Sequence, residues 1–280
     1  MKLTLLGTGC PSVDSRRFGP ACLVSNRDTK ILIDCGSGVT QRLVQSGFKG
    51  AEIDCLLITH LHSDHVIDFY QLIISSWHQY RKKKWKIIGP KGSKKLFSSL
   101  MNAWFDEREL RIKYERRESI EGFELDITEI ENDGKIIIDD IYIEYFKVDH
   151  NPVEYAFGYN FLLNRSKITI SGDTKPCKNL IKHALNADIL LHEVFVENEI
   201  KPFGKMRTSE TIENVKSYHT SSYEVGKIAK EVKAKNLVLY HFVPPIFDEK
   251  ELIKRVSKDF GKSPILGKDL MTLDIDGNIY

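Results

Sequence analysis

The feature that constrains this chain most is the segment Thr59-His60-Leu61-His62-Ser63-Asp64-His65, which follows the apolar run Asp54–Ile58. The apolar run predicts a buried strand. In extended backbone after that strand, the first two histidines of the segment point to the same side. The chain then turns towards a helix, so the aspartate and the third histidine can face a neighbouring point. The pattern therefore predicts four metal ligands, two for each of two ions.

Imidazole and carboxylate groups without thiolates suit zinc, and manganese or iron are alternatives. A different interpretation is a polar strand end whose histidines only make hydrogen bonds. Four potential ligands within six residues, directly after a buried strand, favour metal binding over simple hydrogen bonding. The five cysteines are odd in number and contain no Cys-x-x-Cys pair, so neither a disulfide framework nor a thiolate zinc site is expected.

The composition is that of a globular protein. Apolar residues make up 41% and charged residues 29% of the 280 residues, which excludes disorder and collagen-like repetition. Uncharged apolar runs such as Cys55–Ile58 and Ile189–Leu191 are far too short to cross a bilayer. The first residues carry one lysine and no cleavage site, so no signal peptide and a cytoplasmic location are expected.

Charge is balanced overall but uneven along the chain. The formal net charge of +2 predicts no strong global attraction to nucleic acid. The segment from Arg81 to Lys95 holds eight basic residues and no acidic one, whereas Glu121 to Glu144 holds nine acidic residues opposed by Lys135 alone. The basic run could bind phosphates, but a solvated surface is the favoured interpretation.

Segments typical of strands and helices alternate along the chain, and no linker divides it. Two β-rich halves, each with helices, predict an α/β fold in which two sheets pack face to face. Residues 197–218 are polar and predict a long surface loop. Strands are expected at 2–6, 21–25, 30–34, 54–59, 86–88, 136–138, 141–148, 156–163, 167–171, 188–192 and 236–240, and helices near 38–43, 65–79, 94–104, 177–185 and 222–232.

The histidine-rich segment resembles the His-x-His-x-Asp-His signature of the metallo-β-lactamase-fold hydrolases. Leu6-Gly7-Thr8-Gly9 and Ile33-Asp34-Cys35-Gly36 resemble the first strand turn and the Asp-x-Gly turn of that superfamily, and Gly89-Pro90-Lys91-Gly92 resembles a turn of its ribonuclease Z branch. The resemblance covers nearly the whole chain. It implies one domain over residues 1–280 with a four-layer αββα sandwich, two packed β-sheets flanked by helices.

The resemblance also implies the remaining ligands of a dinuclear centre with two Zn²⁺ ions per chain. His150 matches a single histidine behind a strand, Asp173 in Ser171-Gly172-Asp173-Thr174 matches the carboxylate that bridges both ions, and His241 matches the last ligand. The implied metal ligands are His60, His62, Asp64, His65, His150, Asp173 and His241.

Two further motifs resemble the ribonuclease Z branch. His192-Glu193 resembles its His-Glu motif, and His219-Thr220-Ser221 its histidine-hydroxyl motif. By resemblance, Glu193 holds His219 through a hydrogen bond, His219 faces the substrate, and Asp64 orients the nucleophile, a hydroxide that bridges the metals. The other histidines, His78, His183 and His192, are interpreted as structural.

The substrate is the part that the motifs leave open. Members of the branch that process tRNA carry a long arm behind a Phe-Gly-Tyr strand, whereas here only a hairpin fits between Tyr159 and Ser171. Arg16-Arg17-Phe18-Gly19-Pro20 and the 26 positions between Glu193 and His219 resemble arylsulfatase-like members instead. The favoured function is hydrolysis of a phosphodiester or sulfate ester, with a small anionic ester as substrate.

Three alternatives stay open. The first is a tRNA 3′ endonuclease, acting on RNA, that grips its substrate through Arg81–Lys95. The second is a lactonase or β-lactamase with the same metals. The third is a protein in which the metals only stabilise the fold, which the Glu193 and His219 motifs argue against, since structural sites need no adjacent acid. The family resemblance also implies a homodimer.

Overall fold

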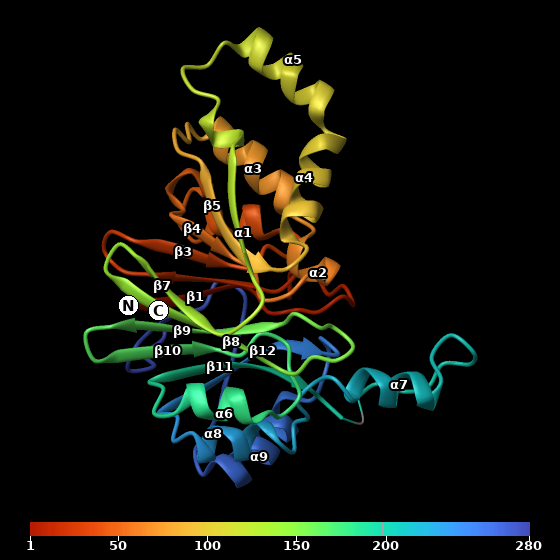
Figure 1. Ribbon diagram of the computed structural model, residues 1–280. Coiled ribbons are helices and arrows are strands. Elements are labelled where there is room, and N and C mark those ends of the chain that lie inside the picture. Colours follow the sequence, from red (N-terminus) through yellow and green to blue (C-terminus); the bar gives the residue numbers. More distant parts are fainter. Residues whose placement is uncertain (198) are drawn as a thin grey trace.

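A computed structural model describes residues 1–197 and 199–280 as two β-sheets packed face to face between outer helices (Figure 1). Each sheet has seven strands within the described residues, and the expected four-layer sandwich is confirmed. The first sheet runs in the order β14 (Thr272–Asp274), β1 (Lys2–Gly7), β2 (Ala21–Ser25), β3 (Lys30–Ile33), β4 (Cys55–Leu57), β5 (Trp85–Pro90) and β6 (Leu125–Ile130). The second runs β13 (Ile265–Leu266), β12 (Asn236–Val243), β11 (Ile189–Phe195), β10 (Ser166–Ile170), β9 (Phe157–Leu163), β8 (Ile141–Lys147) and β7 (Gly134–Ile138).

Helices cover the outer face of each sheet. The first sheet carries α1 (Val39–Gln45), α3 (Phe69–His78) and α4 (Ser93–Ala103), with α5 (Phe105–Glu115) projecting beyond them (Figure 1). The second carries α6 (Lys178–Ala184), α8 (Val225–Glu231) and α9 (Glu249–Phe260). Of the helices in the described residues, none is both long and apolar enough to span a membrane.

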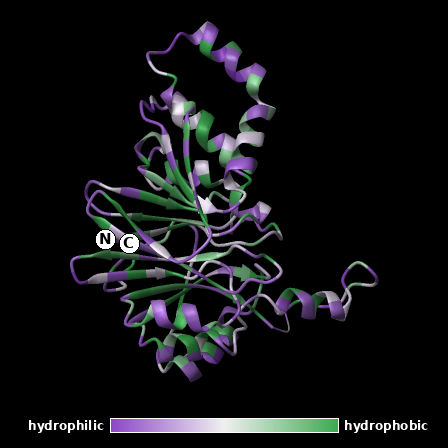
Figure 2. Cartoon of the chain, in the orientation of Figure 1, coloured by the Kyte–Doolittle hydropathy of each residue, from purple (hydrophilic) through white to green (hydrophobic). Residues whose placement is uncertain are grey.

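The central strands are buried on both faces, which explains why they read as nearly continuous apolar runs. In β3, Ile31 and Ile33 point between the sheets, whereas Leu32 points towards the helices. The layer between the sheets takes side chains from both, for example Leu57 from β4 and Phe161 from β9. Figure 2 shows these strands as the apolar centre of the molecule.

The strand directions bring one end of many strands to a common edge. Strands β3 to β6 are parallel, as are β10 to β13, and β8 runs the same way because it is antiparallel to β9. The carboxyl ends of parallel strands are where ligands bind in α/β sheets. His60, His150 and Asp173 follow β4, β8 and β10, so the fold brings them to the same edge.

The long helix expected over 65–79 is wrong, because the structure divides it into α2 (Ser63–Val66) and α3. The break lies at Asp68. Its backbone N–H donates to Cys35 O over 3.1 Å, and its carboxylate accepts from the backbone N–H and hydroxyl of Thr40 over 2.7 and 2.6 Å. These bonds to Cys35 and to α1 compete with helix continuation, a tertiary effect that apolar periodicity does not contain.

The irregular loop expected over 197–218 is also wrong in its second half, where α7 (Ser209–Lys216) projects from the body (Figure 1). The hydroxyl of Thr208 caps this helix by accepting from Thr211 N over 3.1 Å. Serine, threonine and charged residues are common both in loops and at helix N-termini. The composition of the segment therefore did not distinguish a loop from a capped helix. Strands β6, β13 and β14 and helices α5 and α9 were not predicted either.

The lysines of the basic run from Arg81 to Lys95 lie on the surface, as the favoured interpretation expected. Lys83, Lys84 and Lys91 form ion pairs with carboxylates at 2.5, 2.8 and 3.1 Å, and Lys82 contacts Glu118. The partners of Lys84 and Lys91 are Glu124 and Glu131 of the acidic run, because β5 and β6 are neighbours. The two runs therefore neutralise each other in part, which weakens the case for a phosphate-binding patch here.

Arg81 departs from this interpretation because it is buried, with 2% of its surface exposed. Its guanidinium donates to Ile53 O over 2.8 Å and to Lys84 O over 2.9 Å, and it stacks on the Trp85 ring at 3.9 Å from the centroid. Burial lowers the pKa of Arg81 to about 10, so the side chain stays charged at neutral pH. It ties the start of β5 to the segment before β4.

We predict that Arg81→Met lowers the free energy of unfolding by about 3 kcal/mol, because it leaves buried carbonyl groups without donors. Lys82→Met, the matched control at an exposed ion pair, should cost less than about 1 kcal/mol. Urea unfolding of both variants measures the difference. Equal losses would mean that the buried guanidinium does not stabilise this corner of the fold.

Candidate metal centre

The predicted ligands converge on the carboxylate of Asp173. Its Oδ2 atom lies 3.3 Å from His241 Nε2, 3.5 Å from His65 Nε2, 3.9 Å from His60 Nε2 and 4.0 Å from His150 Nε2. These residues belong to segments of both sheets that are far apart in the sequence, so only the sandwich brings them together. The carboxylate lies between two groups of potential ligands.

The first group consists of His60, His62, His150 and Asp173, and a ligand atom from each lies within 4.8 Å of the others. His60 Nε2 and His62 Nδ1 are 2.9 Å apart, and His150 Nε2 is 3.3 Å from the same His62 atom. The second group consists of Asp64, His65 and His241. Asp64 Oδ2 is 3.3 Å from His241 Nε2 and 3.7 Å from His65 Nε2.

The chemistry of these atoms fits a bound cation. His65 Nε2 and Asp173 Oδ1 are buried and have no hydrogen-bond partner among the described residues. His150 Nδ1 faces Tyr218 O at 2.8 Å and must donate to it, which leaves the Nε2 lone pair directed at the cluster. Burial lowers the pKa of His60 and of His150, which favours the neutral imidazole that binds metals.

Asp34 is a residue that the sequence analysis did not assign to the site. Its Oδ2 accepts from His65 Nδ1 over 2.8 Å, and its two oxygens accept from the backbone N–H and hydroxyl of Thr59, each over 2.8 Å. This contact places the Nδ1 proton of His65 and directs Nε2 towards Asp173. The signal was present, because Asp34 is the acid of the Asp-x-Gly turn at the end of β3.

Glu193 contacts His219 as the resemblance implied, but it also holds more of the site. Its buried Oε1 accepts from His219 Nδ1 over 3.0 Å, from Thr220 N over 3.0 Å and from Thr174 N over 3.2 Å. Thr174 follows Asp173 directly, so one carboxylate oxygen positions both the His219 turn and the Asp173 turn. Burial lowers the pKa of His219, but the charge and hydrogen bond of Glu193 outweigh it and raise that pKa to about 8.

His219 is also within ligand distance of Asp173 and His241, so geometry alone permits it as a third partner of the second group. The other histidines lie outside these groups. His192 Nδ1 contacts Glu193 O at 2.7 Å, and His183 stacks on Phe146 at 4.6 Å between ring centroids. His78 lies near Arg111 and Glu115 on the projecting helix α5.

A cleft of about 510 Å³ opens above the cluster. Asp64, Asp173, His62, His219 and His241 line its floor. The rest of the lining comes from Pro11, Val243 and Pro244 and from the segment that carries α7. The candidate ligands His62, Asp64, Asp173 and His241 are thus accessible to a small molecule from this cleft.

Comparison with known proteins places this arrangement in a family. The sequence model described as "Anti-Pycsar protein Apyc1" matches residues 1–251. A ribonuclease Z of Mycolicibacterium paratuberculosis is 30% identical over 282 residues, which cover 99% of each chain. The chain belongs to this family of ribonuclease Z-like, metallo-β-lactamase-fold hydrolases.

Solved structures agree on the fold. The metallo-β-lactamase-fold protein YhfI of Bacillus subtilis aligns with a TM-score of 0.76 at 20% identity, covering 98% of this chain and 99% of that one. The short form of human tRNase Z aligns with a TM-score of 0.71 at 22% identity, again over 98% and 99%. At these identities the likeness concerns the backbone arrangement, and the chemistry rests on the side chains described above.

We predict that Glu193→Ala lowers the free energy of unfolding by about 3 kcal/mol in chelator-treated protein, because buried backbone N–H groups of Thr174 and Thr220 lose their acceptor. Glu193→Gln keeps an acceptor oxygen at that position and should cost less than half as much. Urea unfolding in the presence of a chelator separates this effect from metal binding. Similar losses for both variants would argue that the shared acceptor is unimportant.

Proposed function

We propose that this chain is a metal-dependent phosphodiesterase with two ions per subunit. The observation that carries the proposal is the Asp173 carboxylate, which lies between two groups of imidazole and carboxylate ligands at the floor of an open cleft. Structural metal sites are usually closed, whereas catalytic sites leave room for water and substrate. The residues that would hold the ions are His60, His62, Asp64, His65, His150, Asp173 and His241.

Zinc is the proposed metal because imidazole and carboxylate ligands suit it, and manganese and iron fit the same donors. When bound, such ions acidify water and neutralise charge on a phosphoryl group. Asp64 lines the cleft and would orient the attacking water. His219 is held at Nδ1 by Glu193, whose charge and hydrogen bond raise the pKa of this imidazole, so it would donate a proton to the departing oxygen or stabilise the charge there.

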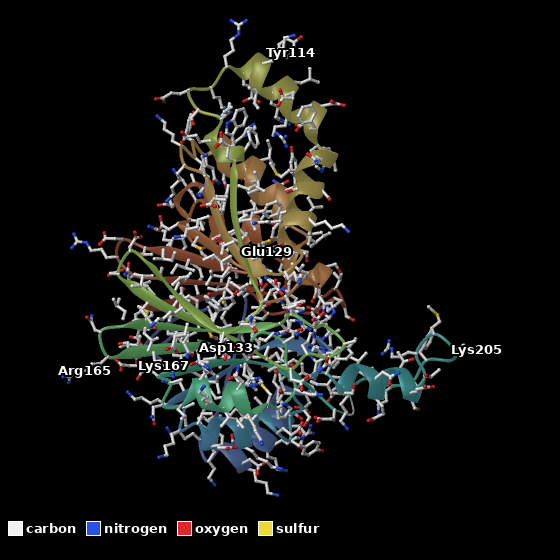
Figure 3. The ribbon with its side chains drawn as sticks, viewed as in Figure 1. Tyr114, Glu129, Asp133, Arg165, Lys167 and Lys205 are labelled. Carbon is white, nitrogen blue, oxygen red and sulfur yellow. The ribbon has the colours of Figure 1, made fainter. Side chains whose placement is uncertain are left out.

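A second candidate is cleavage of precursor tRNA at its 3′ side, and the 30% identity to a ribonuclease Z favours it. The expected plain hairpin is present, since β9 and β10 pair from Leu163 and Ser166 onward. Its turn, marked by Arg165 in Figure 3, lies at the edge of the molecule opposite to α7. Because the alignment covers 99% of both chains, that relative has no room for a long extra arm either, so the short hairpin does not exclude RNA.

The deciding experiment is a substrate panel in zinc, manganese and iron buffers at physiological salt. The panel contains bis(4-nitrophenyl) phosphate, 4-nitrophenyl sulfate, a β-lactam, a lactone and a precursor tRNA. We expect hydrolysis of the phosphodiester and weak tRNA binding that falls steeply with salt, because lysines of the Arg81–Lys95 run are already ion-paired with carboxylates. Efficient single-site cleavage of the tRNA would favour the second candidate, and activity on the sulfate, lactone or β-lactam alone would refute the phosphodiesterase.

Metal content and turnover should separate ligands from other site residues. We predict two ions per chain in metal-replete protein by elemental analysis. His219→Ala should keep both ions but lose about a hundredfold to ten-thousandfold in kcat, the usual contribution of a positioned acid. His60→Ala, the matched control from the ligand set, should lose metal together with activity. Metal loss in His219→Ala like that in His60→Ala would make His219 a ligand instead.

The remaining expectations stay proposals of the same kind. We infer a single domain over residues 1–280 and a homodimer, both from the family resemblance. The proposed chemistry does not depend on a homodimer, because every ligand named comes from one chain.

A further inference from the structure

The cleft has one wall whose role the chemistry above does not explain. It comes from residues 199–218, here named the arm, which lead from the region after β11 to His219 and include α7. The arm contributes Ile200, Met206, Arg207, Ile212, Val215 and Tyr218 to the lining of the cleft. Most of these side chains are apolar, although they lie beside a floor of histidines and carboxylates.

The base of this wall is firmly packed. Ile200, Ile212 and Val215 are partly buried and pack against the small apolar cluster of Cys10, Phe195 and Val243. Their remaining surface therefore stays in place as an apolar strip next to the floor. The tip differs, because Met206 is 85% exposed and Lys205 stands clear of the body (Figure 3).

Among the described residues that line the cleft, Arg207 is the one lysine or arginine. Within residues 1–197 and 199–280 its guanidinium has no ion-pair partner. A guanidinium is planar and weakly hydrated, so it stacks on aromatic rings as well as pairing with anions. An apolar strip that lines the same cleft as such a group offers a binding surface for a flat, electron-rich ring.

The neighbouring aromatic group fits this view. Tyr218 is half-buried, and its ring meets those of His150 and His219 at centroid distances of 5.1 and 4.8 Å. It therefore joins the apolar strip to the floor, where a phosphoryl group would lie. A sugar or a short polar chain would find few hydroxyl partners along this wall, whose polar side chains besides Arg207 are those of Thr211 and the Tyr218 phenol.

We propose that the arm selects substrates whose phosphoester carries an aromatic substituent, with the ring against Ile212, Val215 and Met206 and the Arg207 guanidinium across it. The inference rests on the proposed phosphodiesterase function and names the class of substrate for that site. The volume of about 510 Å³ holds a phosphoryl group and a ring system, and the exposed tip leaves one end of the cleft open.

Binding of two inhibitors tests this inference without a chemical step. Phenylphosphonate and methylphosphonate carry the same anionic head and differ only in the ring. We expect zinc-loaded protein to bind phenylphosphonate about tenfold more tightly by calorimetry, since a ring buries more apolar surface than a methyl group. Because both probes contact the floor equally, the ratio of their Kd values reports on the wall.

Variants locate the effect. Ile212→Thr keeps the branched shape but makes the strip polar, and Arg207→Met keeps the stem but removes the guanidinium. Each should reduce the ratio of Kd values to about threefold or less while the Kd of methylphosphonate stays within about twofold. Ile137→Thr is the matched control, because Ile137 is exposed on β7 and does not line the cleft.

Each outcome has a distinct meaning. Equal binding of both probes by the unaltered protein, or an unchanged ratio in both arm variants, would overturn the inference even if phosphodiesters are hydrolysed. Failure of the protein to bind either phosphonate would overturn it as well. Hydrolysis of the substrate panel is measured separately, so loss of the aromatic preference and failure of the phosphodiesterase proposal remain distinguishable.

Discussion

The whole site depends on one buried carboxylate. Asp173 Oδ2 lies 3.3 to 4.0 Å from four imidazole nitrogens, which belong to His60 after β4, His65 in α2, His150 after β8 and His241 in β12. A buried charge of this kind is costly unless opposite charge compensates it. Neighbouring histidines lower the pKa of Asp173 well below its ordinary value in spite of burial, so it stays ionised and draws cations to this point. The two sheets must therefore pack in a register that brings their ends together around it.

Two further carboxylates hold that arrangement in place from opposite sides. Asp34 fixes the imidazole of His65 on the side of the first sheet, and Glu193 joins the turns of Thr174 and His219 on the side of the second. Both act through hydrogen bonds to groups that face the cluster, and neither is in the ligand groups themselves. Such partners restrict rotamers and tautomers, which lowers the reorganisation needed when a cation or substrate binds.

The arm adds an apolar wall to this floor of histidines and carboxylates. A floor of histidines and carboxylates can act on many anionic esters, so substrate choice has to come from the surfaces beside it. The projecting segment with α7 supplies apolar side chains and the single arginine of the cleft. The arm is packed against the body at its base and exposed at its tip. A ring could therefore bind against the packed part, near the histidines and carboxylates, while the rest of a substrate extends towards solvent.

The sequence by itself indicated the two packed sheets, the strand before Thr59 and the ligand candidates of the Thr59–His65 segment, because apolar periodicity and closely spaced histidines are local properties of the chain. The more distant candidates, His150, Asp173 and His241, came only from the family resemblance. Tertiary structure decided what depends on distant partners. Asp68 ends a helix by bonding to Thr40, and Arg81 is buried because carbonyl groups of another segment accept from it. Asp34 reaches His65 only once β3 and β4 pair. A pattern within one segment contains no information about which distant atom will satisfy a side chain, and these assignments therefore required the folded arrangement.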